Sequence, residues 1–462
     1  MRKLISNGHI VTATDDYAGD ILLDGETIAS LGAPGSFAAL AVDEVIDAQG
    51  KYVFPGAIDV HTHMELPLPA TVGSDDFATG TIAAACGGTT TIIDFANQQR
   101  GHSLHEALRS WHDKADGRAA IDYGFHITIT DLANAPEEAM DEMIAAGVTT
   151  FKLLMAYPGT FMVDDETIYR VLRRSASLGG LVMVHAENGI VIDFIVREAV
   201  AAGHTAPMFH ALTRPAILEG EATRRAIALA ALADAPLYVV HVSCAHSLNA
   251  IADARNKGLP VWGETCPQYL YLNDSCYAAR GFESAKFVCT PPMRKDADNE
   301  ALWLGLQRRV LQVVSTDHAA FNFAGQKELG RADFSKIPNG LPGVEHRVML
   351  MYRAVHNGRL QLQHFVDLVA TMPAKLFGLF PRKGTIAPGS DADLVIFDPY
   401  RAMTISAANQ HQRVDYTPYE GITVQGVPDT VLLRGRVIVK NGQYVGGAPG
   451  GQYLQRKTFV EP

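Results

Sequence analysis

Short apolar runs with the composition of β-strands alternate with helical patterns through the middle of this chain. The eight runs are Ala57–His61, Thr89–Asp94, Tyr123–Ile129, Thr149–Leu154, Leu181–His185, Leu237–His241, Pro260–Glu264 and Gln312–Asp317. Helical patterns lie between several of them, as over residues 103–114, 136–146, 165–177 and 220–232. Alternation of this kind is typical of right-handed βαβ units, whose strands form a parallel sheet.

Eight such repeats favour a closed (β/α)₈ barrel, a fold whose active sites lie at the C-terminal ends of the strands. A doubly wound open sheet is the alternative, but no Gly-x-Gly-x-x-Gly pattern follows the first run. At 462 residues the chain also exceeds the size at which a single core usually stops growing, so a second, smaller domain is expected.

Both ends of the chain carry short strand-like runs separated by tight turns. Near the N-terminus, Asp20–Asp24 and Glu26–Ser30 lie on either side of Gly25, and Asp-Gly suits a two-residue hairpin because it tolerates positive φ. Similar runs near the C-terminus are Asp393–Phe397, Thr430–Arg434 and Arg436–Lys440. We therefore expect a β-sandwich domain built from residues 1–54 and 384–445, a barrel over 55–383, and a C-terminal tail over 446–462.

Charge and cysteine usage limit the partners and the compartment. The formal net charge of −11 at pH 7 argues against nucleic acid or an anionic membrane as the main partner. The first residues do not form a secretory signal, and nowhere do enough apolar residues follow one another to span a bilayer. The five cysteines form no Cys-x-x-Cys pair, which is typical of reduced thiols: Cys86, Cys244, Cys266, Cys276 and Cys289. These features indicate a cytoplasmic location.

Residues able to bind a metal stand at the ends of five of the eight runs. His61 and His63 close the first run, and because side chains alternate along a strand, both point to the same face. The later runs contribute Lys152, His185, His241 and Asp317. A single histidine at a strand end is more often a hydrogen-bonded structural residue. Four histidines and one aspartate on one rim predict a metal centre, because imidazole nitrogens and carboxylate oxygens suit zinc-class ions.

Lys152 is the unusual member of this rim. A protonated ammonium has no lone pair for a metal, but burial beside cations would lower its pKa and favour the neutral amine. A neutral amine reacts with carbon dioxide to form a carbamate, an anion whose two oxygens can bridge two metals. From the residues alone, a lysine paired with a nearby carboxylate is an equally good interpretation.

The rim residues and several longer runs resemble the amidohydrolase superfamily, and within it the D-hydantoinase and dihydropyrimidinase family. The rim motifs are His61-Thr-His63, Lys152, His185-Ala-Glu-Asn188, His241-Val-Ser243 and Ser315-Thr-Asp-His318. The longer runs are Phe151–Tyr157, Gly263–Tyr269, Thr290–Arg294, Phe321–Arg331 and Ile337–Glu345. The resemblance extends from Asn7-Gly8 to Gly451–Leu454 and covers essentially the whole chain.

The resemblance implies two divalent metal ions in one site. A first ion is expected on His61, His63 and Asp317, and a second on His185 and His241. Carboxylated Lys152 (N6-carboxylysine) would bridge them. Zinc is the expected metal, because these ligands suit it and hydrolysis needs no redox change; manganese and cobalt are the alternatives.

The resemblance also implies the reaction, which is hydrolysis of the cyclic amide of hydantoins or dihydropyrimidines to N-carbamoyl amino acids. A metal-bound hydroxide would attack the carbonyl, and Asp317 would pass its proton to the departing ring nitrogen. Tyr157 would donate to the developing oxyanion, and Thr290 and Asn339 would hold the cyclic amide. For Asp317, the alternative role is metal binding alone. For Tyr157 the alternative is packing at the barrel rim, and for Thr290 and Asn339 it is turn chemistry. His318 is left out, because strand alternation turns it away from the rim.

Apolar residues of the rim loops are expected to contact the substituent on the substrate ring, with core packing as the alternative for each. These residues are Met64, Leu66, Leu68, Leu154 and Phe161. An apolar pocket suits alkyl or aromatic groups better than charged ones.

Related activities remain as alternatives. A dihydroorotase would be expected to carry arginine two residues past the second histidine, where this chain has Glu65, which would repel an anionic substrate. Allantoinase acts on a neutral substrate, and only the long runs around Tyr157 and Asn339 oppose it. Non-catalytic dihydropyrimidinase-related assembly proteins lack the metal ligands, whereas all six positions are filled here. Finally, the resemblance implies a homotetramer in which the C-terminal tail contacts a neighbouring subunit.

Overall fold

Eight parallel strands form the centre of the computed structural model, which describes residues 1–134, 136–279 and 281–462. They are β6 (Ala57–Thr62), β9 (Thr89–Asn97), β10 (Asp122–Thr128), β11 (Thr150–Leu154), β12 (Leu181–His185), β13 (Leu237–Val239), β14 (Val261–Thr265) and β15 (Val313–Val314). Each strand pairs with the next one, and a parallel bridge between Thr62 and His318 joins the two ends of the sheet. The expected (β/α)₈ barrel is therefore confirmed.

Two of the expected strands end earlier than their apolar runs. β13 stops at Val239 and β15 at Val314, although the runs continue to His241 and Asp317. The backbone leaves the extended conformation there, with φ of 38° at His241 and 52° at Asp317. The rim residues of these strands therefore sit on strained left-handed turns just beyond the strands, where their side chains can be re-aimed.

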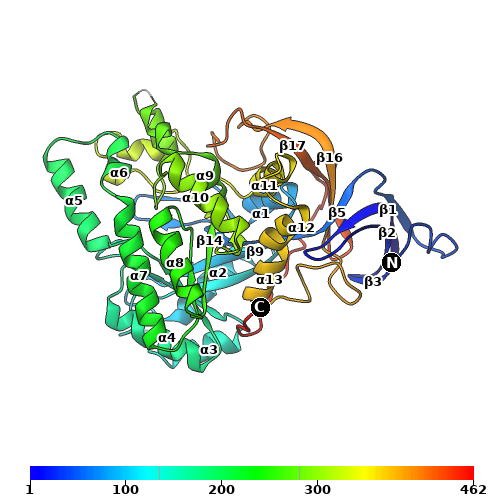
Figure 1. Cartoon of the computed structure of the whole chain (residues 1–462), viewed down its shortest axis with the longest axis horizontal. Coiled ribbons are helices and arrows are strands. Elements are labelled where there is room, and N and C mark those ends of the chain that lie inside the picture. The colour runs from blue at the N-terminus through cyan, green and yellow to red at the C-terminus, as the bar shows by residue number, and fades with distance from the viewer. Residues whose placement is uncertain (135, 280) are drawn as a thin grey trace.

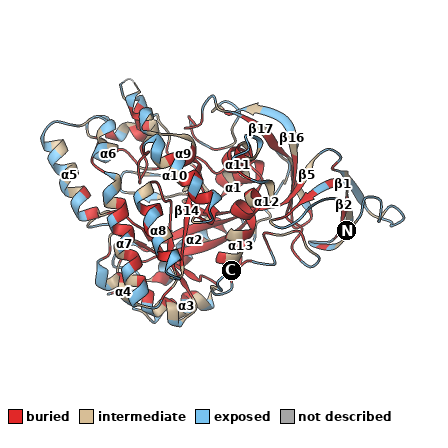
Figure 2. Cartoon of the chain, in the orientation of Figure 1, coloured by how far each residue is buried: buried red, intermediate tan, exposed pale blue. Residues whose placement is uncertain are grey.

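Helices surround the barrel and cover its outer face (Figure 1). The long ones are α1 (Phe77–Cys86), α2 (Leu104–Ala115), α4 (Asp165–Ser177), α5 (Gly189–Ala201), α7 (Ala216–Leu232), α8 (Ala245–Asn256), α10 (Asp296–Gln307) and α11 (Arg347–His356). Shorter ones are α3 (Ala139–Ala145), α6 (Met208–Leu212), α9 (Pro267–Tyr271), α12 (Leu362–Val366) and α13 (Met372–Leu376). Figure 2 shows buried strands inside and helices with exposed outer faces, the pattern of a parallel sheet covered on its outside. No helix in the described residues has the length and apolar character needed to cross a membrane.

The two ends of the chain meet in a second sheet of nine strands, beside the barrel in Figure 1. The N-terminal strands are β1 (Arg2–Val11), β2 (Asp16–Asp24), β3 (Thr27–Gly32), β4 (Glu44–Asp47) and β5 (Tyr52–Pro55). The C-terminal strands are β16 (Leu394–Thr404), β17 (Thr423–Leu433), β18 (Arg436–Lys440) and β19 (Gln443–Tyr444). β5 pairs with β16, and one apolar core contains residues of both ends, including Ile5, Ile21 and Leu432. The expected β domain formed by both termini is therefore confirmed.

The C-terminal tail lies on the chain's own barrel. Tyr123, the second residue of β10, donates its N–H to the Gln452 carbonyl and accepts from the Leu454 N–H at 2.7 Å. Further along, the Phe459 N–H donates to the Gly179 carbonyl at 2.8 Å. These contacts place residues 451–459 across the N-terminal end of the barrel, away from the rim. Contact of the tail with a neighbouring subunit stays a prediction.

A buried ion cluster joins the barrel, the β domain and the tail. Lys383 Nζ lies 2.6 Å from carboxylate oxygens of Asp122 and Asp393 and 3.0 Å from Asp391. Asp122, at the start of β10, also pairs with Arg434 of the β17–β18 turn and accepts the Gln452 N–H at 2.9 Å. One carboxylate therefore connects all three parts of the chain.

We expect Lys383→Met to destabilise the protein by about 3–5 kcal/mol, because it removes the cation paired with the buried Asp393 and one of the two cations beside Asp122. Thermal unfolding followed by circular dichroism measures the effect as a lower midpoint. An unchanged midpoint would show that the cluster makes no net contribution to stability.

Candidate active site

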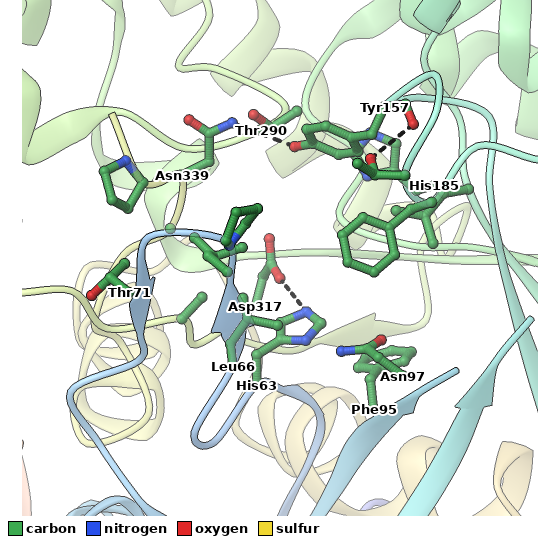
Figure 3. Close-up of a pocket in the computed structure, with 18 of the residues that line it drawn as sticks. His63, Leu66, Thr71, Phe95, Asn97, Tyr157, His185, Thr290, Asp317 and Asn339 are labelled. Atoms are coloured by element: carbon green, nitrogen blue, oxygen red, sulfur yellow. Dashed lines mark hydrogen bonds and ion pairs between the residues drawn. The ribbon is translucent and has the colours of Figure 1, made fainter. Parts of the chain in front are cut away.

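A cavity of about 510 Å³ opens at the C-terminal ends of the barrel strands. All nine residues that the sequence assigns to metal or substrate line it: His61, His63, Lys152, Tyr157, His185, His241, Thr290, Asp317 and Asn339. In Figure 3, Tyr157, Thr290 and Asn339 lie across the cavity from His63 and Phe95. Residues as far apart in the sequence as His61 and Asn339 thus line one cavity, because the C-terminal ends of all the strands in a barrel lie on the same side.

Two histidines of β6 and its following turn converge on one carboxylate. His61 Nε2 and His63 Nε2 each lie 3.1 Å from Asp317 Oδ1 (Figure 3 shows the contact with His63). The three ligand atoms lie within 4.8 Å of one another, close enough to share one ion. Burial raises the pKa of Asp317, but His61 and His63 outweigh it and hold the pKa well below its usual range. Asp317 is therefore an anion, the form in which a carboxyl group binds a metal.

A second pair of imidazoles faces the same cavity. His185 Nδ1 lies 2.9 Å from His241 Nε2, so these two nitrogens point at one another. Burial, reinforced by His185 and Lys152, lowers the pKa of His241 well below its usual value. The two nitrogens form a hydrogen bond with one another, and a neutral imidazole also has a lone pair that it can offer to a metal. This donor set therefore fits a second divalent metal.

Two buried glutamates orient these imidazoles from behind. Glu264, the fourth residue of β14, pairs with His61 Nδ1 and also accepts the backbone N–H of His241 at 3.2 Å. Glu187 lies 2.8 Å from His185 Nε2. Histidines that bind metals commonly donate their second N–H to a carboxylate, which directs the other nitrogen at the ion. We did not identify either glutamate from the sequence, although Glu264 ends an apolar run and Glu187 stands two residues past a rim histidine.

The carboxylates around His61 raise the pKa of its imidazole. Burial lowers the pKa of His61, but Glu264 and Asp317 outweigh this effect and raise it to about 9. Without a metal, His61 is therefore protonated at neutral pH. An ion that binds Nε2 must displace this proton, so metal affinity is expected to fall as the pH falls.

Lys152 is a buried amine at the inner end of the cavity. Its Nζ lies 4.9 Å from the centre of the Phe95 ring, and it forms no ion pair with a carboxylate in the described part of the chain. Burial lowers the pKa of Lys152 to about 8, which increases the neutral fraction at physiological pH. The alternative of a lysine paired with a carboxylate thus has no support in the geometry.

Tyr157 faces the metal-binding residues from the loop after β11. Its backbone is left-handed, with φ of 65°, and its hydroxyl accepts a long hydrogen bond from Asn339 Nδ2 at 3.5 Å. The Arg214 guanidinium lies 5.7 Å from the centre of the ring. Burial raises the pKa of Tyr157, so its hydroxyl keeps its proton at neutral pH and can donate a hydrogen bond to an oxyanion.

The outer part of the cavity is apolar. Four of the five expected apolar residues line it: Leu66, Leu68, Leu154 and Phe161. The expectation for Met64 is wrong, because its side chain is fully buried and packs on α1, where a Cβ on Gly80 would lie 2.3 Å from its sulfur. The loops also contribute apolar residues that we did not predict: Pro69, Ala70, Leu329 and Ile337.

Two polar residues near the rim point elsewhere. Glu65 does not line the cavity but pairs with Arg118 at 2.9 Å, so the argument that it repels an anionic substrate is wrong. His318 Nε2 lies 3.2 Å from Asp75, while its Nδ1 accepts the Gly343 N–H at 3.1 Å. His318 is thus engaged outside the metal-binding residues, in the direction that strand alternation predicted.

Comparison with known proteins agrees with this geometry. Residues 52–438 match the family model described as the amidohydrolase family. A D-hydantoinase of Geobacillus stearothermophilus is 53% identical over 461 residues, covering 99% of this chain and 97% of the relative. A D-hydantoinase of Streptomyces coelicolor is 51% identical over 459 residues, covering 99% and 98%. A solved dihydropyrimidinase from Brevibacillus agri has a TM-score of 0.98 and 51% identity, with 100% of both chains covered.

Proposed function

The chain belongs to the amidohydrolase family and is a cyclic amidohydrolase, and we propose that it opens hydantoin or dihydropyrimidine rings to N-carbamoyl amino acids. One observation carries the proposal: ligand-type residues, a tyrosine donor and an apolar outer wall line a single cavity of about 510 Å³. Cavities of this size accommodate small molecules rather than macromolecules. The D-hydantoinase names of the relatives support a cyclic amide as the substrate.

We propose that two divalent ions bind in this cavity. His61, His63 and Asp317 would hold the first, and His185 and His241 the second. When bound, two such ions supply an acidified water as nucleophile and a Lewis acid for the carbonyl oxygen. Zinc is the metal proposed, because imidazole and carboxylate ligands suit it, with manganese and cobalt as alternatives.

A carbamate on Lys152 is proposed as the bridging ligand. The neutral amine would attack carbon dioxide, forming the N–C bond and releasing one proton, and the product is an anion with two oxygens. Support comes from the buried position of Lys152, its pKa of about 8 and the position of its strand between the two histidine groups. The bridge would also explain how the chain keeps a lysine amine beside metal ions.

The chain's own residues would then carry the proton and hold the substrate. Asp317 accepts a proton from the attacking water and delivers it to the ring nitrogen as the C–N bond breaks. The Tyr157 hydroxyl donates to the carbonyl oxygen as negative charge develops on it. Groups of Thr290 and Asn339 hold the cyclic amide, and the apolar outer wall receives an alkyl or aromatic substituent.

A rate comparison on metal-analysed enzyme tests the proposal. The substrates are hydantoin, dihydrouracil, both enantiomers of 5-phenylhydantoin, and allantoin. We expect hydrolysis of the unsubstituted rings and of D-5-phenylhydantoin, because the relatives are named D-hydantoinases and the outer wall is apolar. Faster turnover of allantoin than of any other ring would favour the allantoinase alternative. Loss of all five activities with two metals bound would overturn the proposal.

We also propose a cytoplasmic homotetramer. Support for self-association comes from five exposed apolar side chains on three successive helices: Ile190 and Phe194 of α5, Met208 and Leu212 of α6, and Ile217 at the start of α7. Exposed apolar side chains that gather into a patch are typical of a protein interface, and in a homo-oligomer a second copy of the chain covers them. Five free cysteines support a reducing compartment. Sedimentation of the purified chain tests the assembly, and a monomer would contradict it.

A further inference from the structure

Lys327 is a buried lysine in the run Phe321–Arg331, and this side chain has no part in the chemistry described above. It begins a short 3-10 helix over Lys327–Gly330, and none of its surface is exposed. Its Nζ donates to three backbone carbonyl oxygens, those of Val288 at 2.8 Å, Pro338 at 2.7 Å and Gly340 at 2.8 Å. An ammonium has three N–H groups, so all of its donors are used.

These three carbonyls belong to the two loops that carry the substrate-holding residues. Val288 stands two residues before Thr290, and Pro338 and Gly340 are the direct neighbours of Asn339. The loops also touch one another, because the Gly340 N–H donates to the Val288 carbonyl at 3.1 Å. Lys327 therefore sits at the junction between the loops and binds both of them.

The loop around Asn339 also contacts the segment that follows Asp317. A Cβ on Gly340, whose φ is 144°, would lie 2.4 Å from the carbonyl oxygen of Ala319. The Ala319 N–H donates to the Leu341 carbonyl at 3.0 Å, and Ala319 stands two residues past Asp317. The loop around Asn339 thus lies between the segment of Asp317 and the ammonium of Lys327. A shift of that ammonium would move Asn339 relative to the metal-binding residues.

Packing alone does not account for a lysine at this position. In the described residues the Lys327 amine has no ion-pair partner, and burial disfavours its charged form, whereas the three carbonyl acceptors around Nζ favour it. Taking a cation out of water with only neutral partners is costly. Methionine would fill a similar volume without this cost but would donate no hydrogen bonds.

We propose that Lys327 is a positioning residue for recognition of the cyclic amide. Its ammonium fixes the spacing between the loop at Thr290 and the loop at Asn339, so that groups on both can engage the same ring. The inference rests on the proposed function, because it takes these two residues to hold the substrate. Lys327 does not touch the reacting atoms and acts only through the two loops.

Lys327→Met tests this role in the metal-loaded enzyme. We expect KM for hydantoin to rise about 10- to 100-fold, because a misplacement of about 1 Å in a positioning group can have an effect of that size. The metal content should stay at the wild-type value, and kcat should change less than KM. Lys327→Gln, whose amide keeps two N–H donors, should give a smaller increase in KM.

Lys383→Met is the matched control, because it removes another buried lysine at the opposite end of the barrel. It should lower the unfolding midpoint and leave KM unchanged. Hydrogen exchange gives a second readout that does not need activity. In Lys327→Met, peptides covering residues 286–291 and 336–341 should exchange faster, while those covering β10–β12 should not change.

The outcomes separate this inference from the proposed function. An unchanged KM together with unchanged loop exchange would overturn the role of Lys327. An equal rise in KM in Lys383→Met would also overturn it, because general destabilisation would then explain the effect. If the wild-type enzyme hydrolyses no cyclic amide, the proposed function fails, whereas faster loop exchange in Lys327→Met would still show that the ammonium holds the two loops.

Discussion

Lys152→Ala is expected to lose both metal ions and to reduce kcat/KM on the order of 10⁴-fold or more, the scale of losing a whole catalytic unit. The reason is that one side chain would provide an oxygen to each ion. Without it, each group of histidines keeps an incomplete ligand set. Elemental analysis of the purified variant and the hydantoin rate measure the two effects together.

The chemistry of the bridge can be tested separately from the loss of the side chain. Wild-type enzyme prepared with ¹³C-labelled carbon dioxide should show one carbamate carbon signal per chain, which Lys152→Ala should lack. Adding a short carboxylate such as propionate to Lys152→Ala should restore part of the metal content, since its two oxygens can take the place of the carbamate. Two metals and full turnover in the variant without any addition would refute the bridge.

Tyr157→Phe is expected to lower kcat/KM by about 10²–10³-fold, equivalent to about 3–4 kcal/mol for one oxyanion donor. The metal content should not change, because the hydroxyl is not among the proposed ligands. Burial raises the pKa of Tyr157, so the donor stays protonated across the neutral range. The loss should therefore be the same at pH 7 and pH 8.

Tyr123→Phe is the matched control for this substitution. Tyr123 is also a buried tyrosine, and its hydroxyl donates to Asp116, but it lies at the N-terminal end of the barrel, under the C-terminal tail. Its kcat/KM should equal that of the wild type. A Tyr157→Phe variant with wild-type kcat/KM would remove this residue from the oxyanion role.

The residues that could be placed from the sequence are those whose position follows from local periodicity. The alternation of apolar runs with helical patterns predicted the barrel, and the ends of those runs predicted six residues that line one cavity. Strand alternation correctly grouped His61 with His63, both of which reach Asp317. It also placed His318 outside this group.

The errors concern residues whose direction depends on loop geometry. Met64 and Glu65 follow β6 at once, and the sequence offered no reason to separate them from Leu66 and Leu68. In the structure Met64 turns into the core and Glu65, with φ of 51°, turns to Arg118, while the next loop residues face the cavity. A loop without a repeating pattern has no periodicity from which such directions can be inferred.

The sequence by itself determined the order of the elements, the barrel and the identity of the rim residues, because periodicity and residue chemistry are local properties. Only the tertiary structure decided which groups support that rim. Glu264 reaches His61 across 203 positions, and Lys327 binds carbonyls of two loops that lie 39 and 11–13 positions away. Such contacts are set by how strands and loops pack in three dimensions. Because every residue has a backbone carbonyl, nothing in the sequence marks the three that Lys327 binds.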